Sequence, residues 1–211
     1  MSKREAQPGW DLPDPAGRGR TFVYVLPLCG EDLTKLGFTH DPVQRFRSFH
    51  PRFFALFDLE RGLLVETGRL REARRLERLL IERWPEHRAQ APLLVAEAAG
   101  GHTEWFRGIA EEVDAFVRRT ADRYGYPLHA PLSGWLRARF SERADQLYAW
   151  SQRLLEMIQW QAMSLPPEAR DPRYAKALVD NLDACRAVGM PLDSLLPAEV
   201  LAWYAAACGR G

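Results

Sequence analysis

Two short apolar runs near the start of the chain constrain the fold more than any other feature. Residues 21–26 and 33–38 are rich in β-branched and aromatic side chains, which favour strands, and a short segment containing Gly30 separates them. Asp41 and Pro42 follow, and this pair is typical of a helix start because Asp caps the first turn and Pro fits the first helical position. The order predicts a β-hairpin followed by a helix.

Prolines and glycines divide the next part of the chain into further elements. Residues 53–59 and 63–67 have the composition of strands. Residues 69–84 carry apolar side chains at helical spacing and end before Pro85. A second helix is expected from residue 109 to the glycine at 125, after a long connecting loop.

Beyond Pro131 the pattern is helical throughout. One long helix is expected over residues 135–158, and the proline pair at residues 166–167 separates it from the next. Further helices are expected to begin at Asp171 and at Pro197. The predicted organisation is therefore a flexible N-terminal arm over residues 1–20, a domain of strands and helices over residues 21–125, and an all-α domain over residues 126–211.

Composition excludes several classes of protein. The 211 residues include 29 Lys and Arg against 28 Asp and Glu, a net charge of +1, so the chain is not a globally basic binder. A hydrophobic content of 46% indicates a folded chain rather than a disordered one. The 3 cysteines form no metal-binding or disulfide pattern. Because no secretory signal or membrane span is apparent, we expect a cytoplasmic protein.

One acidic residue interrupts the apolar face of the helix expected over residues 69–84. At roughly 100° per residue, the apolar side chains of this helix fall within an arc of roughly 140° that also contains Glu77. A carboxylate on a buried face is costly unless it is paired or bound to a cation. We weigh an ion pair, with Arg45 as the candidate partner, against metal ligation; position alone favours the ion pair.

Five motifs, taken in order, resemble those of the GIY-YIG nuclease superfamily. They are Phe22-Val23-Tyr24, Lys35-Leu36-Gly37, Arg45 in the helix after Asp41, Glu77 in the later helix, and Thr103-Glu104-Trp105-Phe106. The last is similar to the closing motif of a phage-type branch that also favours lysine in the second motif. The resemblance covers residues 21 to 108 and implies an α+β fold class, with a small mixed sheet flanked by helices.

The resemblance implies a metal-dependent endonuclease that hydrolyses phosphodiester bonds in nucleic acid, with DNA favoured. Glu77 would bind one Mg²⁺ (or Mn²⁺), a hard cation that takes one or two carboxylates and keeps several waters. Tyr24 would act as general base or position the attacking water, and Arg45 would clamp the scissile phosphate. Lys35 would be a second phosphate contact, and His40 a proton shuttle.

Two departures from the family pattern leave other functions open. Phe22 replaces the glycine of the first motif, and Lys35 replaces the tyrosine of the second. A chain with these changes could be a nucleic-acid-binding module that kept the fold and lost the chemistry. It could also be a helical protein-interaction partner, such as a regulator or an immunity-type factor, whose arginines serve surface solubility.

Local charge favours nucleic acid as the partner. Residues 35–54 hold four basic side chains against one acidic, and residues 69–78 hold five against two, so each segment carries about +3. Arginines in these segments are the expected contacts to nucleic acid, namely Arg47, Arg52, Arg74 and Arg78. We expect no membrane partner, and a possible homodimer through the helical C-terminal domain.

Overall fold

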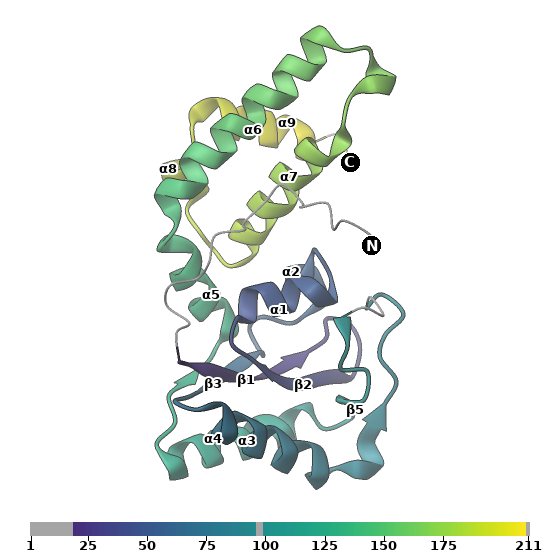
Figure 1. Cartoon of the computed structure of the whole chain (residues 1–211), viewed down its shortest axis with the longest axis vertical. Coiled ribbons are helices and arrows are strands. Elements are labelled where there is room, and N and C mark those ends of the chain that lie inside the picture. The colour runs from purple at the N-terminus through teal and green to yellow at the C-terminus, as the bar shows by residue number, and fades with distance from the viewer. Residues whose placement is uncertain (1–18, 96–98, 210–211) are drawn as a thin grey trace, which may run out of the picture. The chain divides into compact units, whose positions relative to one another are not determined.

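The computed structural model describes residues 19–95 and 99–209 (Figure 1). These residues fall into two compact units, one ending at Leu136 and one beginning at Arg137. Most of the arm expected over residues 1–20 lies outside the described residues.

The first unit is built on one sheet with the strand order β4-β5-β2-β1-β3-β6. Its strands are β1 (Thr21–Pro27), β2 (Leu33–Thr39), β3 (Leu63–Thr67), β4 (Arg88–Ala89), β5 (Trp105–Arg107) and β6 (Leu128–His129). The predicted hairpin is confirmed as β1 and β2, and the α+β class is confirmed as well. Every strand pairing within the described residues is antiparallel, so the expectation of a mixed sheet is wrong.

Helices cover both faces of this sheet. They are α1 (Pro42–Phe49), α2 (Phe53–Leu56), α3 (Leu70–Arg83) and α4 (Ala110–Tyr124), with a short 3₁₀ turn at Pro85–His87. Figure 1 shows α1 and α2 on one face of the sheet and α3 and α4 on the other. The start of α1 is as predicted, because the Asp41 side chain accepts a hydrogen bond from the backbone N–H of Gln44, with Pro42 in the first turn.

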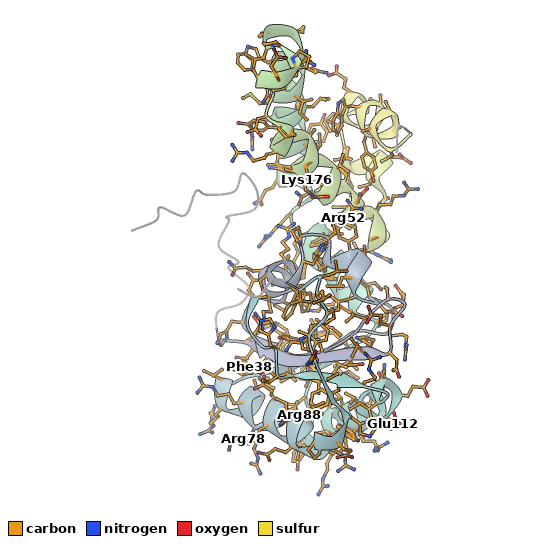
Figure 2. All side chains as sticks on the ribbon, turned by 90° about the vertical axis from the view of Figure 1, so that its right-hand side faces the viewer. Phe38, Arg52, Arg78, Arg88, Glu112 and Lys176 are labelled. Atoms are coloured by element: carbon orange, nitrogen blue, oxygen red, sulfur yellow. The ribbon has the colours of Figure 1, made fainter. Side chains whose placement is uncertain are left out.

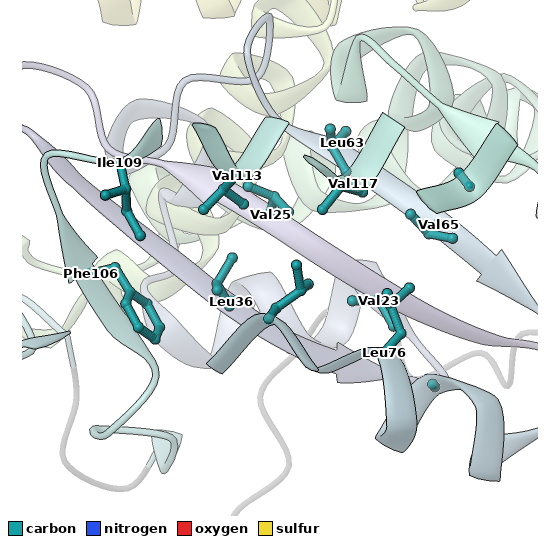
Figure 3. Close-up of a cluster of buried hydrophobic side chains, with 13 residues drawn as sticks. Val23, Val25, Leu36, Leu63, Val65, Leu76, Phe106, Ile109, Val113 and Val117 are labelled. Atoms are coloured by element: carbon teal, nitrogen blue, oxygen red, sulfur yellow. The ribbon is translucent and has the colours of Figure 1, made fainter. Parts of the chain in front are cut away.

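Strand alternation assigns each side chain of β1 to one of the two faces. Val23 and Val25 point into the apolar core shared with α3 and α4, where they pack with Leu76 and Val113 (Figure 3). Tyr24 points to the opposite face, toward the aromatic side chains of α1. The core therefore fixes the register that brings Tyr24 to the α1 face.

Residues 53–59 do not form the strand that their composition predicts, since Phe53–Leu56 are helical. The ring centroids of Phe53 and Phe57 lie 6.0 and 6.5 Å from that of Phe46. A helical turn brings rings four residues apart close to each other, whereas a strand would place them on one face but about 13 Å apart. Packing of the aromatic cluster therefore overrides strand propensity here.

The second unit contains only helices in its described part. These are α6 (Ala144–Ser164), a 3₁₀ turn at Pro167–Ala169, α7 (Pro172–Ala187), α8 (Leu192–Leu195) and α9 (Ala198–Cys208), preceded by α5 (Leu132–Ser141). The single long helix expected over residues 135–158 is wrong, because the chain turns at residues 142–143. There the N–H of Arg143 donates to the carbonyl of Phe140, and Arg139 pairs with Glu142 at 2.9 Å.

The first unit extends to Leu136, beyond the domain boundary at residue 125 that the sequence predicts. Strand β6 pairs with β3, and the buried Leu132 packs against Gly62. The domain limits stay a prediction. The homodimer also stays a prediction, and exposed apolar side chains that could serve such an interface occur on α6, namely Met157, Trp160 and Met163.

Within the described residues, no helix is both long and apolar enough to cross a membrane.

Candidate active site

Tyr24 and Gly37 form the first contact of the candidate site. The two residues are partners across β1 and β2, and the Tyr24 side chain is buried. A Cβ atom at position 37 would lie 2.3 Å from the phenol oxygen of Tyr24. The glycine of the second motif is therefore required by the close approach of the tyrosine ring, and not by a turn.

Arg45 lies beside this tyrosine and comes from α1. Its Nε donates a hydrogen bond of 3.3 Å to the Tyr24 oxygen, and its Nη1 donates one of 2.5 Å to the carbonyl of Ala99. The guanidinium carbon lies 4.3 Å from the centroid of the Phe49 ring, which supports it by a cation–π contact. Three contacts thus fix the orientation of one guanidinium.

Lys35 is the most deeply buried charged side chain of the site, with 0% of its surface exposed. Its Nζ donates to Glu104 Oε2 and to the carbonyl of Gly101, each at 2.6 Å. Burial lowers the pKa of Lys35 to about 8, against the opposing effect of the Glu104 carboxylate. The ammonium is therefore held in place by protein oxygens.

The segment from Ala99 to Glu104 approaches both cations through its backbone. Gly101 has a φ of 71°, and a Cβ there would lie 2.6 Å from Glu104 Oε2 and 2.9 Å from Lys35 Nζ. Only glycine combines this conformation with so close an approach. The carbonyls of Ala99 and Gly101 accept hydrogen bonds from Arg45 and Lys35, respectively.

Glu77 reaches the same region from α3. The side chain is half-buried, and burial raises its pKa to about 6, with a further contribution from the negative charge of Glu104. The charges of Lys35, Arg45 and Arg74 act in the opposite direction. Among the described residues, Glu77 forms no ion pair, so the pairing with Arg45 considered from the sequence is not observed.

Burial also raises the pKa of Tyr24, to about 12, although the neighbouring Arg45 lowers it. Glu104 and Glu77 raise it further. The phenol therefore keeps its proton at neutral pH. Five side chains share this electrostatic environment, and we call them the Tyr24 cluster: Tyr24, Lys35, Arg45, Glu77 and Glu104.

His40 is not part of the cluster. Its Nδ1 faces the Thr21 hydroxyl at 3.1 Å and the carbonyl of Arg20 at 3.0 Å, three residues before Tyr24 along β1. At about 3.3 Å per strand residue, this places it roughly 10 Å along the sheet. The proton-shuttle role expected for His40 therefore has no support from its position.

Glu104 is the member of the cluster that sequence reasoning missed. It lies within a motif that is similar to one of a phage-type branch, but that similarity assigns it no role. The β2–β5 pairing sets Lys35 opposite Trp105, which brings the neighbouring carboxylate within 2.6 Å of the ammonium. A lysine within a strand that is expected to be buried needs an acidic partner. That requirement at Lys35 could have pointed to Glu104.

The four arginines expected to contact nucleic acid lie in two places. Arg47 is half-buried in α1, and Arg52, just before α2, stacks at 5.0 Å from the Phe54 centroid. Arg74 and Arg78 are exposed on α3.

The acidic residues of the Tyr24 cluster, Glu77 and Glu104, offer only carboxylate oxygens as metal ligands. No group of three or more His, Cys, Asp or Glu side chains that could enclose a metal occurs among the described residues. Zinc-type sites are disfavoured by this donor set, whereas Mg²⁺ is bound through one or two carboxylates and keeps its other waters. The half-buried Glu77 carboxylate fits that second requirement.

Comparison with known families supplies one match. Residues 21–121, a little under half of the chain, match the family model of the T5orf172 domain. This domain is associated with phages and is found in some nucleases. The search of curated proteins and the search of solved structures each returned no match. The stretch that contains the Tyr24 cluster is thus similar to the T5orf172 domain.

Proposed function

We propose that the chain is a metal-dependent endonuclease of the GIY-YIG type that hydrolyses phosphodiester bonds in nucleic acid, DNA in the first instance. The observation that carries the proposal is the hydrogen bond of Arg45 to Tyr24, with the buried Lys35 and with Glu77 near enough for their charges to interact, from four separate elements. Groups with displaced pKa values gather at functional sites, because burial and charge are arranged there for chemistry. The T5orf172 match over the same residues supports it.

Arg45 and Lys35 supply positive charge to the reacting phosphate. Arg45 presents a planar guanidinium that can bind two phosphate oxygens, while Lys35 acts as a point charge. Because charge develops on these oxygens in the transition state, donors that are already oriented stabilise it without reorganisation. The contacts to Ala99, Gly101 and Phe49 provide that orientation.

Tyr24 positions the attacking water in this proposal. A phenol with a pKa of about 12 is a poor proton acceptor at neutral pH, which supports positioning over general-base catalysis. Its oxygen accepts a hydrogen bond from Arg45 and retains its own proton as a donor.

Glu77 would hold Mg²⁺ or Mn²⁺ through its carboxylate. The bound ion would supply positive charge for the leaving 3′ oxygen. The chain's own contribution is a half-buried carboxylate on a rigid helix, near two fixed cations.

Phe22, which replaces the glycine of the first motif, has a packing contact in the fold. Phe22 is buried, and its ring packs edge-on against Trp135 with centroids 5.5 Å apart. The larger side chain therefore has a packing role. Lys35, which replaces the tyrosine of the second motif, has Glu104 as a partner that stabilises its buried ammonium.

Nicking of supercoiled plasmid in the presence of Mg²⁺ or Mn²⁺ tests the proposal. The wild-type protein should cleave, and Glu77→Ala should lose at least about 100-fold in rate. Glu82→Ala is the matched control, because Glu82 is an exposed carboxylate on the same helix. Equal cleavage by the Glu77 and Glu82 variants would contradict the proposal. Salt-sensitive DNA binding without cleavage by the wild type would favour the non-catalytic module instead.

A further inference from the structure

Four arginines form a continuous ridge on the outer face of α3. Arg71, Arg74, Arg75 and Arg78 are all exposed, at the i, i+3, i+4, i+7 spacing that places side chains on one side of a helix. The opposite side of α3 is buried against the sheet through Ala73, Leu76 and Leu80. Figure 2 shows Arg78 on the surface of the first unit. We call these four residues the arginine ridge.

The ridge carries positive charge that its surroundings do not neutralise. Among the residues that the structure describes, no ion pair or hydrogen bond engages any of the four guanidinium groups. Glu72 and Glu82 lie on the same helix but pair with none of them. Like charges at i and i+4, as in Arg71 and Arg75, destabilise a helix. Ion pairing within the helix therefore does not account for these four charges.

The surface of the arginine ridge contains an open depression, and the ridge lies next to Glu77 of the Tyr24 cluster. Its four arginines and Leu70 line a shallow open depression. Arg74 is near enough to Glu77 for its charge to lower the pKa of that carboxyl. Glu77 lies three residues after Arg74 and directly before Arg78 on the same helix, so the ridge and the carboxylate of the proposed site are neighbours on α3.

We propose that the arginine ridge binds the sugar–phosphate backbone of the nucleic acid beside the scissile phosphate. This inference rests on the proposed function and adds Arg71 and Arg75 to the arginines expected from the sequence. At about 1.5 Å per residue, the ridge spans roughly 10 Å along the helix axis. That length matches about three steps of one strand in duplex DNA, at about 3.4 Å each. Contacts of this kind fix position and carry no sequence preference.

An anionic lipid surface is the other polyanion to consider. A membrane-binding helix inserts an apolar face beside its basic one. The apolar face of α3 is already buried in the protein core, so this helix lacks the face that insertion requires. The chemistry of the ridge therefore favours nucleic acid.

The test is the salt dependence of DNA binding, measured with chelator so that no cleavage occurs. The probes are a mixed-sequence duplex, the corresponding single strand, and phosphatidylserine vesicles. Two ridge variants, Arg71→Gln with Arg75→Gln and Arg74→Gln with Arg78→Gln, are compared with wild type. The matched control is Arg119→Gln with Arg123→Gln, which removes two exposed charges at the same spacing from α4. Gln is chosen because its helix propensity is close to that of Arg.

Each ridge pair should weaken binding by about 10-fold at low salt. The slope of log K against log salt should fall by about 1.8 for duplex or about 1.4 for single strand. The control pair should leave the slope within about 0.3 of wild type. The inference is overturned if the ridge and control pairs change the slope equally, or if only the vesicles distinguish them.

The two proposals fail separately in this design. An unchanged slope together with cleavage that depends on Glu77 removes the ridge and leaves the nuclease. A ridge-dependent slope in a protein that never cleaves plasmid DNA removes the nuclease and leaves a backbone-binding surface.

Discussion

The first unit holds two sets of basic side chains in opposite environments. In the Tyr24 cluster, Lys35 is fully buried, and both it and Arg45 donate hydrogen bonds to defined protein oxygens. On the arginine ridge, four guanidinium groups are exposed and, among the described residues, unpaired. In the proposed nuclease this difference corresponds to two tasks: the fixed charges would stabilise a transition state, and the open charges would attract a polyanion.

Substitution of Arg45 by lysine should have the largest effect. Lysine keeps the charge but cannot maintain the bonds to Tyr24 and Ala99 while also binding a phosphate through two oxygens. We expect the cleavage rate to fall by about 100-fold or more, with the DNA dissociation constant within about threefold of wild type. Single-turnover cleavage and binding on the same preparation measure both. A rate within about threefold of wild type would remove Arg45 from the chemistry.

Gly37→Ala should break the cluster through packing. The added Cβ would overlap the Tyr24 phenol, which is confined by aromatic rings of α1. We expect a loss of about 2 kcal/mol in the free energy of unfolding, typical of overpacking, together with loss of cleavage. Denaturant titration provides the stability value.

Gly134→Ala is the control for that substitution. Gly134 lies in α5, and a Cβ added there would meet no atom within 4 Å, so alanine should be neutral or stabilise by up to about 1 kcal/mol. Equal effects at the two glycines would show that the close approach at Gly37 is unimportant.

Glu77→Gln should have the smallest effect on folding, and it should be stabilising. The pKa of Glu77 is raised to about 6, so the native state binds this proton more tightly than the unfolded chain. The resulting penalty is fully present above about pH 6 and disappears as the pH falls below about 4.5. A shift from 4.5 to about 6 corresponds to about 2 kcal/mol, which partial exposure reduces to about 1 kcal/mol.

Denaturant titrations with chelator, at several pH values, measure this difference. Glu77→Gln should gain stability at about pH 7.5 and lose the gain near about pH 4. A variant that is less stable than wild type at the higher pH would indicate that Glu77 has a structural role.

Local signals in the sequence predicted much of this unit. The β-branched runs of β1 and β2, the Asp41 cap and the glycine at 125 each determine their element through short-range geometry. The order of the motifs predicts Tyr24, Lys35, Arg45 and Glu77 as site residues. Electrostatic interactions link these side chains in the fold, and their roles stay predictions.

Long-range packing accounts for what the sequence did not predict. Phe53 and Phe57 pack their rings on Phe46, and no local signal reports that contact. Glu104 joins the cluster through the β2–β5 pairing, which connects distant segments of the chain. His40 is adjacent to the motif residues in sequence, but its ring is bonded toward Thr21.

The most direct test separates rate from affinity in single-turnover cleavage with Mg²⁺. It compares wild type, Glu77→Gln and the Arg71→Gln, Arg75→Gln pair over a range of protein concentrations. We predict that Glu77→Gln lowers the rate at saturation by at least about 100-fold and leaves the half-saturating concentration unchanged. The ridge pair should raise the half-saturating concentration by about 10-fold and keep the saturating rate. Cleavage by Glu77→Gln at the wild-type rate, or a loss of saturating rate in the ridge pair alone, would contradict this division of tasks.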